Sequence, residues 1–178
     1  LHRDPWLGLP DLDLVVEGQA SELAKRLPQA LARELGLLVP CSTREHGQYG
    51  TVELMVDLPE GMGGRWLLDV ASAREEIYPV PAGNPEVVLG SLEDDLARRD
   101  FSVNAMAFVL GEHGSSSAAL LDLYNGSRHL ERRELQFLHA KSLRDDPTRL
   151  LRAARYVARL GFRLSASSRQ QASDTMAA

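Results

Sequence analysis

The sequence is poor in cysteine and contains no long apolar segment. Cys41 is the only cysteine among its 178 residues, so the chain cannot form an internal disulfide. That composition is typical of proteins from a reducing compartment. No run reaches about 18 consecutive apolar residues, the length that a membrane-spanning helix needs. These absences predict a cytoplasmic protein that does not cross a membrane.

A zinc site and a secretion signal are also unsupported. The five histidines are scattered, and no pair of cysteine or histidine residues has the spacing of zinc ligands. The first residues, Leu1 to Asp4, contain neither an initiator methionine nor the apolar stretch of a signal peptide. We therefore expect the natural polypeptide to begin further upstream.

Charge is unevenly distributed, although the net charge is only −5. Residues 1–140 contain 12 Lys and Arg against 22 Asp and Glu, whereas residues 141–178 contain 8 against 3. An acidic body with a basic end is typical of a metal site beside a surface that binds a polyanion. A solvated helix face explains the basic end equally well, so charge alone leaves both interpretations open.

Hydrophobic periodicity and turn residues predict a mixture of strands and helices. Strands are expected over short apolar or alternating segments at 11–16, 51–58, 65–71 and 119–123. The second and third should form an antiparallel hairpin around the turn GMGG. Helical segments are expected at 20–35, within 92–110 and at 141–160. Gly36 should end the first of these, and Pro28 could kink or split it.

Two carboxylates lie two residues apart in the first expected strand. Asp11 and Asp13 should project from one face, roughly 6.6–7 Å apart along the chain. Leu12 and Leu14 should then face the core. Mg²⁺ prefers oxygen ligands and binds through one or two carboxylates together with substrate phosphates. The pair therefore suggests a metal site, although two such residues alone more often mark an exposed polar strand.

Asp69 is a third candidate acid. It lies in the strand expected at residues 65–71, between two apolar residues that should be buried. On the face of Asp11 and Asp13 it could complete a two-metal site. An ion pair with Arg74 is an equally good interpretation, because the sequence does not show which strands are neighbours.

Arg98 and Arg99 are followed directly by Asp100. Two adjacent guanidinium groups can clamp a triphosphate or a ribose while the acid orients one of them. A surface cluster of ion pairs is the commoner explanation for three such residues.

The basic end contains a helix that should start at Asp146 and Pro147. Pro147 suits the first helical position, which makes Asp146 the expected cap. Arginines at 149, 152, 155 and 159 should form one stripe, opposite Leu150, Ala153, Ala154 and Val157. Asp146 and Arg149 are neighbours at i and i+3. Such a pair could read a nucleobase edge, because a wrong base would leave buried polar groups unpaired.

In this order, the segments resemble the class II tRNA nucleotidyltransferase and bacterial poly(A) polymerase family. The matching stretches are RDPWLGLPDLDLVVEG (3–18), LDVASAREEIY (68–78), LEDDLARRDFSVNAMA (92–107), LDLYNG (121–126) and RDDPTRLLRAARYVARLGF (144–162). Five matches in sequence order argue against an accidental combination.

The resemblance implies roles for individual residues. Asp11 and Asp13 match metal-binding acids, and we add Asp69 as a third catalytic candidate. The residues that match nucleotide contacts or their supports are Arg3, Arg99, Asp100, Asn104, Asp146, Arg149, Arg152 and Arg155. Those that match a flexible loop, which reshapes the site between nucleotides, are Asp122, Tyr124, Asn125 and Gly126.

The resemblance also implies a fold and an activity. The fold would be α+β: a nucleotidyltransferase head of the DNA polymerase beta type (1–138), with a small mixed or antiparallel sheet flanked by helices. The start of an all-helical neck would follow (139–178). The implied reaction adds nucleotides (CCA or A) from CTP or ATP to the 3′ end of tRNA without a template and releases pyrophosphate. Mg²⁺, as two ions, is the implied cofactor, and the implied partners are a nucleoside triphosphate and the 3′ end of tRNA or another RNA.

Several alternatives remain open. Addition of CCA, of A alone and of CC, and poly(A) synthesis, share these motifs. A truncated relative that binds nucleotide or RNA without catalysis is a further alternative. The sequence does not indicate the oligomeric state.

Overall fold

The computed structural model describes residues 11–46, 50–110 and 118–177, and the chain divides into two compact units. Unit 1 comprises residues 1–74 and 89–92, and unit 2 comprises residues 75–88 and 93–178. Both contain strands and helices, as an α+β fold requires. Among the residues that the structure describes, no helix has the length and apolar composition needed to cross a membrane.

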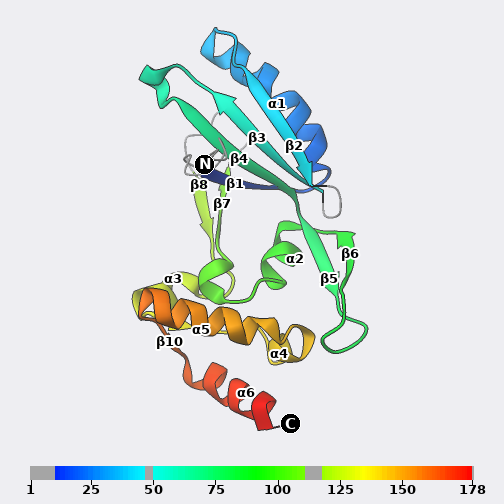
Figure 1. Ribbon diagram of the computed structural model, residues 1–178, viewed down its shortest axis with the longest axis vertical. Helices are drawn as coiled ribbons and strands as arrows, with labels where there is room; N and C mark the ends of the chain where they lie inside the picture. The colour runs from blue at the N-terminus through cyan, green and yellow to red at the C-terminus, as the bar shows by residue number, and fades with distance from the viewer. Residues whose placement is uncertain (1–10, 47–49, 111–117, 178) are drawn as a thin grey trace, which may run out of the picture. The chain divides into compact units, whose positions relative to one another are not determined.

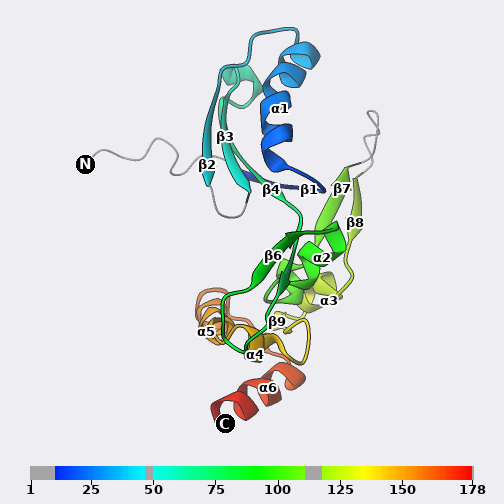
Figure 2. The same cartoon turned by 90° about the vertical axis from the view of Figure 1, so that its right-hand side faces the viewer.

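Unit 1 is a four-stranded sheet with one helix packed on it (Figures 1 and 2). Its strands follow across the sheet in the order β1 (Asp11–Val16), β4 (Arg65–Ser72), β3 (Thr51–Asp57) and β2 (Cys41–His46). β1 is parallel to β4, whereas β3 is antiparallel to both β4 and β2. The predicted small mixed sheet and its β3–β4 hairpin are therefore confirmed. A short 3-10 turn, η1 (Glu60–Met62), lies within the hairpin connection.

The helix α1 (Ala20–Leu35) is continuous through Pro28, so the proline does not split it. It ends at Gly36, whose φ of 65° is the left-handed conformation that glycine adopts readily. Leucines of α1 pack against the buried side chains of Val39, Leu54 and Val56. Because side chains alternate along a strand, this packing leaves the other face of the sheet for the intervening residues of β3.

Leu12 does not take the core position expected for it. Leu12 is 46% exposed, because β1 is an edge strand of the sheet and the apolar cluster under α1 is centred on β3. Leu14 is only half-buried. The acids of β1 are therefore carried by a strand with one free edge among the described residues.

The remaining elements form small ladders and short helices. The ladders pair β5 (Arg74–Ile77) with β6 (Glu86–Leu89), β7 (Ala107–Leu110) with β8 (Ala118–Leu121), and β9 (Glu134–Leu135) with β10 (Arg163–Leu164). The helices are α2 (Leu92–Ala97), the 3-10 turn η2 (Ser102–Asn104), α3 (Gly126–Glu131), α4 (Ser142–Asp145), α5 (Thr148–Leu160) and α6 (Ala166–Ala177).

Two helical predictions need correction. The apolar residues 107–110, expected to be helical, form strand β7 because they pair with β8. The helix expected at 141–160 is two helices, α4 and α5. Asp146 between them has extended dihedral angles (φ −137°, ψ 95°), as favoured for a residue that precedes proline.

Unit 2 has its own hydrophobic core. Phe101 stacks on Phe137 with ring centroids 5.3 Å apart and meets Tyr156 edge-on at 5.6 Å. The other buried members are Leu135, Leu143, Ala153 and Ala172. This core joins residues on both sides of the predicted head–neck boundary at 138/139, and that boundary stays a prediction.

Candidate functional site

The three candidate acids project from one face of the unit 1 sheet. In the parallel β1–β4 pair, Asp13 lies directly opposite Asp69, and Asp11 lies two residues earlier, opposite Leu67. Partners in register share a face, as do residues two apart in one strand. That face is the one opposite α1, because Leu68 packs into the cluster beneath the helix. The fold thus brings together the acids that the sequence could not place.

A fourth acid, Glu53, joins this face. It lies opposite Asp69 in the β3–β4 pair, and the sequence analysis missed it. The side chains of Arg44 and His46, on β2, approach its carboxylate oxygens to 3.5 and 3.0 Å. Glu53 therefore has cationic or hydrogen-bonding neighbours on β2.

The environment of Asp69 suits a bound cation. Its Oδ1 atom is buried and has no hydrogen-bond partner among the described residues. Burial and the negative charges of Glu53, Asp13 and Asp11 raise the pKa of Asp69, although His46 opposes them. A cation near these carboxylates would remove that repulsion and satisfy the orphaned oxygen. The acids thus fit a divalent ion.

These acids do not by themselves form a complete metal cage. Within the described ranges, no group of three or more His, Cys, Asp or Glu side chains could hold a metal ion alone. This is the expected condition for Mg²⁺, which takes one or two carboxylates and completes its shell with water and substrate phosphates.

In unit 2, the two adjacent arginines are held by an acid that the sequence analysis missed. Asp95 Oδ1 accepts hydrogen bonds from Arg98 Nε (3.0 Å) and Nη2 (2.6 Å). Asp95 Oδ2 accepts from Arg99 Nε (3.2 Å) and Nη2 (2.7 Å). The signal was available, because Asp95 lies three and four residues before the two arginines, the spacing of helical neighbours.

Asp100, expected to orient one of those arginines, has a different partner. Its Oδ2 atom accepts from Arg152 Nε at 2.6 Å, and its Oδ1 atom accepts from the Phe101 N–H. Nearby, Asn104 Nδ2 donates to Tyr156 Oη at 3.0 Å, and Asn104 Oδ1 is buried with no described partner. Asp100 and Asn104 thus tie this segment to α5.

The predicted base-reading pair is in contact. Arg149 Nε lies 3.8 Å from Asp146 Oδ2, and Arg149 Nη2 donates to the Arg98 carbonyl oxygen at 2.8 Å. Asp146 Oδ1 also accepts from the N–H and hydroxyl of Thr148, the first residue of α5, although the N-cap position expected for Asp146 is taken by Pro147. Arg149 is only 3% exposed, and its Nη1 atom has no hydrogen-bond partner in the described structure. A ligand that accepted from Nη1 would satisfy this donor.

The predicted basic stripe on α5 is wrong in one respect. Arg149 is buried together with Ala153, which was expected on the opposite side of the helix, whereas Ala154 and Val157 are exposed. The reason is that Arg149 packs inward to reach the Arg98 carbonyl. The outer arginines Arg152, Arg155 and Arg159 line a hollow of about 200 Å³ together with Tyr156 and Leu160.

Residues 122–126 form a turn that is tied to α3. Asp122 Oδ1 accepts from the Gly126 N–H at 2.6 Å, and Oδ2 accepts from the N–H (3.0 Å) and hydroxyl (2.6 Å) of Ser127. Burial alone would raise the pKa of Asp122, but these hydrogen bonds lower it. Tyr124 lies within the turn, and Asn125 has left-handed dihedral angles before α3. Movement of this segment stays a prediction.

Replacing Gly126 by alanine should destabilise unit 2. An added Cβ would lie 2.3 Å from the Ser102 carbonyl oxygen and 2.7 Å from Met106 Cγ. We expect overpacking to lower the free energy of unfolding by about 1–3 kcal/mol, measured by urea denaturation. Gly61→Ala is the control, because a Cβ there meets nothing within 4 Å. Equal urea midpoints for the two variants would contradict the close packing.

Arg3 lies outside the described residues, so its predicted phosphate contact stays a prediction.

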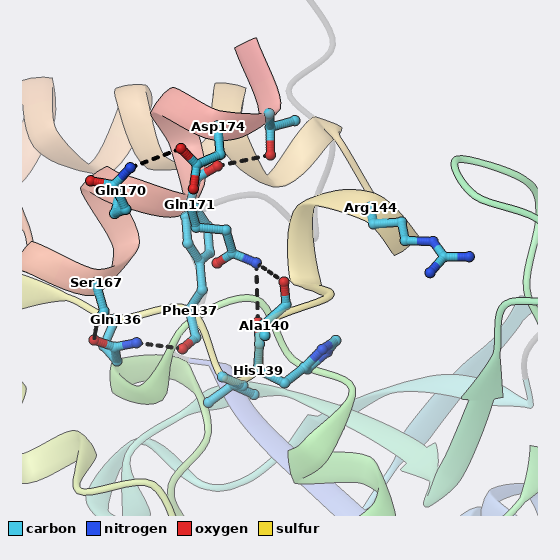
Figure 3. A pocket seen from close by; sticks show the side chains of 11 residues that line it. Gln136, Phe137, His139, Ala140, Arg144, Ser167, Gln170, Gln171 and Asp174 are labelled. Carbon is cyan, nitrogen blue, oxygen red and sulfur yellow. Dashed lines mark hydrogen bonds between the residues drawn. The ribbon is translucent and has the colours of Figure 1, made fainter. Parts of the chain in front are cut away.

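A separate hollow of about 870 Å³ lies between the segment 136–140, α4 and α6 (Figure 3). Its polar groups bond largely to one another: Gln171 donates to the carbonyls of His139 and Ala140, and Gln136 to that of Phe137. It contains none of the predicted site residues.

Known proteins with similar sequences are tRNA nucleotidyltransferases. The CC-adding tRNA nucleotidyltransferase of Deinococcus radiodurans is 42% identical over 177 residues, covering 98% of this chain and 43% of that protein. The A-adding tRNA nucleotidyltransferase of Aquifex aeolicus is 40% identical over 170 residues, covering 94% of this chain and 18% of that protein. The chain therefore spans less than half the length of these relatives.

Solved structures share the fold. A CCA-adding enzyme in apo form II matches with a TM-score of 0.76 and 33% identity, over 90% of this chain and 34% of that chain. A tRNA nucleotidyltransferase complexed with a primer tRNA and an incoming ATP analog matches with a TM-score of 0.65 and 34% identity, over 96% and 41%. The fold is thus an α+β nucleotidyltransferase head, as predicted. The family model of the poly A polymerase head domain matches residues 1–136, and the chain belongs to this family.

Proposed function

We propose that this protein is a tRNA nucleotidyltransferase that adds nucleotides from ATP or CTP to the 3′ end of tRNA and releases pyrophosphate. The observation that carries the proposal is the register of β1 and β4, in which Asp13 lies opposite Asp69 on the sheet face away from α1. The names of the relatives and the tRNA and ATP analog bound to one structural neighbour support the substrates. We keep the cytoplasm as the predicted location.

The acids of unit 1 would hold the metal. Asp11 and Asp13, with Asp69 beside them, would bind Mg²⁺, two ions in our proposal. When bound, Mg²⁺ would neutralise charge on the triphosphate and favour ionisation of the RNA 3′-hydroxyl. The contribution of the protein is to fix these carboxylates on a sheet before substrate arrives.

The arginines of unit 2 would bind and select the nucleotide. Guanidinium groups of Arg99, Arg152 and Arg155 would offset triphosphate charge through charge-assisted hydrogen bonds. Asp146 and Arg149 would read the base edge as acceptor and donor, and the unpartnered Arg149 Nη1 supports this role.

In the proposed reaction, the oxygen of the RNA 3′-hydroxyl forms a bond to the α-phosphorus of the nucleotide. The bond from that phosphorus to the oxygen bridging to the β-phosphorus breaks, and pyrophosphate leaves while the hydroxyl proton passes to solvent. Phosphoryl transfer of this kind depends mainly on positioning and charge stabilisation. The chain therefore needs no covalent nucleophile of its own.

An incorporation assay tests the proposal and separates its variants. The protein is incubated with Mg²⁺ and tRNAs that lack one, two or three terminal nucleotides, with labelled CTP and ATP supplied separately. We expect labelled tRNA with at least one combination, and the productive combination distinguishes CC, A and CCA addition. Long A tracts would instead identify a poly(A) polymerase. Nucleotide binding without any product would overturn the proposal in favour of a non-catalytic relative.

A further inference from the structure

We propose that Asp95 is a positioning residue for nucleotide binding, which acts by fixing the guanidinium of Arg99. This inference rests on the proposed function, because it assigns Arg99 to the bound triphosphate. Asp95 is one of three consecutive acids on α2, with Glu93 and Asp94, and its helical spacing from the two arginines makes it a candidate partner. Burial and hydrogen bonding in the structure distinguish it from the other two.

Asp95 is fully buried, with 0% exposure. Each of its carboxylate oxygens accepts a fork of two N–H groups, one fork from Arg98 and one from Arg99. Burial alone would raise the pKa of Asp95, but these hydrogen bonds lower it. Asp95 thus remains ionised and fixes the planes of both guanidinium groups.

The two arginines differ in their exposure and in the N–H donors that remain available to a ligand. The Arg98 side chain is 17% exposed, and its Nη1 donates to Glu76 Oε1 at 3.0 Å. Tyr78 Oη in turn donates to Glu76 Oε2. Arg98 is thus held by acids on two sides and, through its carbonyl, accepts from Arg149. Its contacts with Glu76, Asp95 and Arg149 give Arg98 a structural role within unit 2.

Arg99 instead remains available at the surface. Its side chain is 34% exposed, and among the described residues its guanidinium bonds only to Asp95. A guanidinium has five N–H donors. Two are used on Asp95, so three remain for an anionic ligand. An arginine held in this way loses less side-chain freedom on binding than a mobile one, which strengthens the interaction.

The test uses the full chain and steady-state incorporation from ATP. Asp95→Asn removes the charge that orients Arg99 at nearly constant volume. We expect the KM for ATP to rise on the order of tenfold, the scale of a lost charged hydrogen bond, with a smaller change in kcat. Glu93→Gln removes an equal charge from an exposed position of α2 and should leave KM unchanged. A purely structural role would instead lower the active fraction, and therefore kcat.

A double-mutant cycle decides whether Asp95 acts through Arg99. In an Arg99→Ala background, Asp95→Asn should change KM by less than about twofold, because its target is already absent. An undiminished effect in that background would overturn the inference. If Asp95→Asn does not fold, as judged by circular dichroism, Asp95→Glu replaces it, since this variant keeps the charge but displaces the carboxylate. A folded Asp95→Glu variant with unchanged KM would also overturn the inference.

The outcomes separate this inference from the proposed function. If the unmodified protein incorporates ATP and Asp95→Asn behaves like Glu93→Gln, only the role of Asp95 fails. If the unmodified protein neither binds nor incorporates ATP, the proposed function fails and the role of Asp95 falls with it.

Discussion

Replacement of Asp13 by asparagine should reduce nucleotide incorporation by on the order of 10³ or more, because a lost metal ligand removes several kcal/mol of charge stabilisation. The same change should leave stability unchanged or slightly higher. Asp13 lies opposite Asp69 with like charge, and Asp13 contributes to the repulsion that raises the pKa of Asp69. Loss of activity without loss of stability is the combined expectation.

Single-turnover incorporation from ATP and urea denaturation of the same preparations measure the two effects. Glu45→Gln is the matched control, because Glu45 is an exposed acid of the same sheet that lies opposite Val52, on the α1 side. It should retain activity. An Asp13→Asn protein that extends tRNA at the unmodified rate would show that Asp13 has no part in the chemistry.

Replacement of Arg149 by methionine should weaken base selection by about 10- to 10²-fold, because it removes one hydrogen bond from a charged donor, about 1.5–3 kcal/mol. Methionine fills much of the buried volume but cannot donate to the base or to the Arg98 carbonyl. Asp146 would keep its hydrogen bond from Thr148 and lose its cationic neighbour.

The measurement is the ratio of kcat/KM for ATP to that for GTP. Both kcat/KM values are measured on the same preparation, so a loss of folded protein lowers both equally and leaves their ratio unchanged. Arg169→Met, at an exposed position of α6, removes an equal charge and should preserve the ratio. If Arg149→Met discriminates as well as the unmodified protein, the base is read elsewhere.

Much of unit 1 could be predicted because its local patterns agree with its tertiary structure. The alternation in Asp11–Val16, the turn between β3 and β4, and Gly36 after α1 each specify an element without help from distant residues. Strand β2 was missed because CSTREH offers almost no apolar alternation, and its pairing with β3 defines it. Residues 107–110 were mistaken for helix because a short apolar run fits either structure.

The candidate site was predictable as a set of residues but not as an arrangement. Asp69 could be named from its strand, yet its place beside Asp13 depends on which strands pair and in which register. The arginines of α5 look alike in the sequence, and only packing shows that Arg149 is buried while Arg155 is exposed. Asp95 was identifiable from helical spacing, but the adjacent Asp100 offered an apparently simpler partner.

The proposed reaction requires Asp11 and Asp13 to bind a divalent cation together. Electron paramagnetic resonance of Mn²⁺, titrated against the protein with a fixed amount of ATP, tests this directly. ATP alone serves as the reference. More Mn²⁺ should be bound than ATP alone accounts for, and a variant carrying both Asp11→Asn and Asp13→Asn should lose that excess. Equal binding by the variant and the unmodified protein would contradict the metal site on which the proposed function is built.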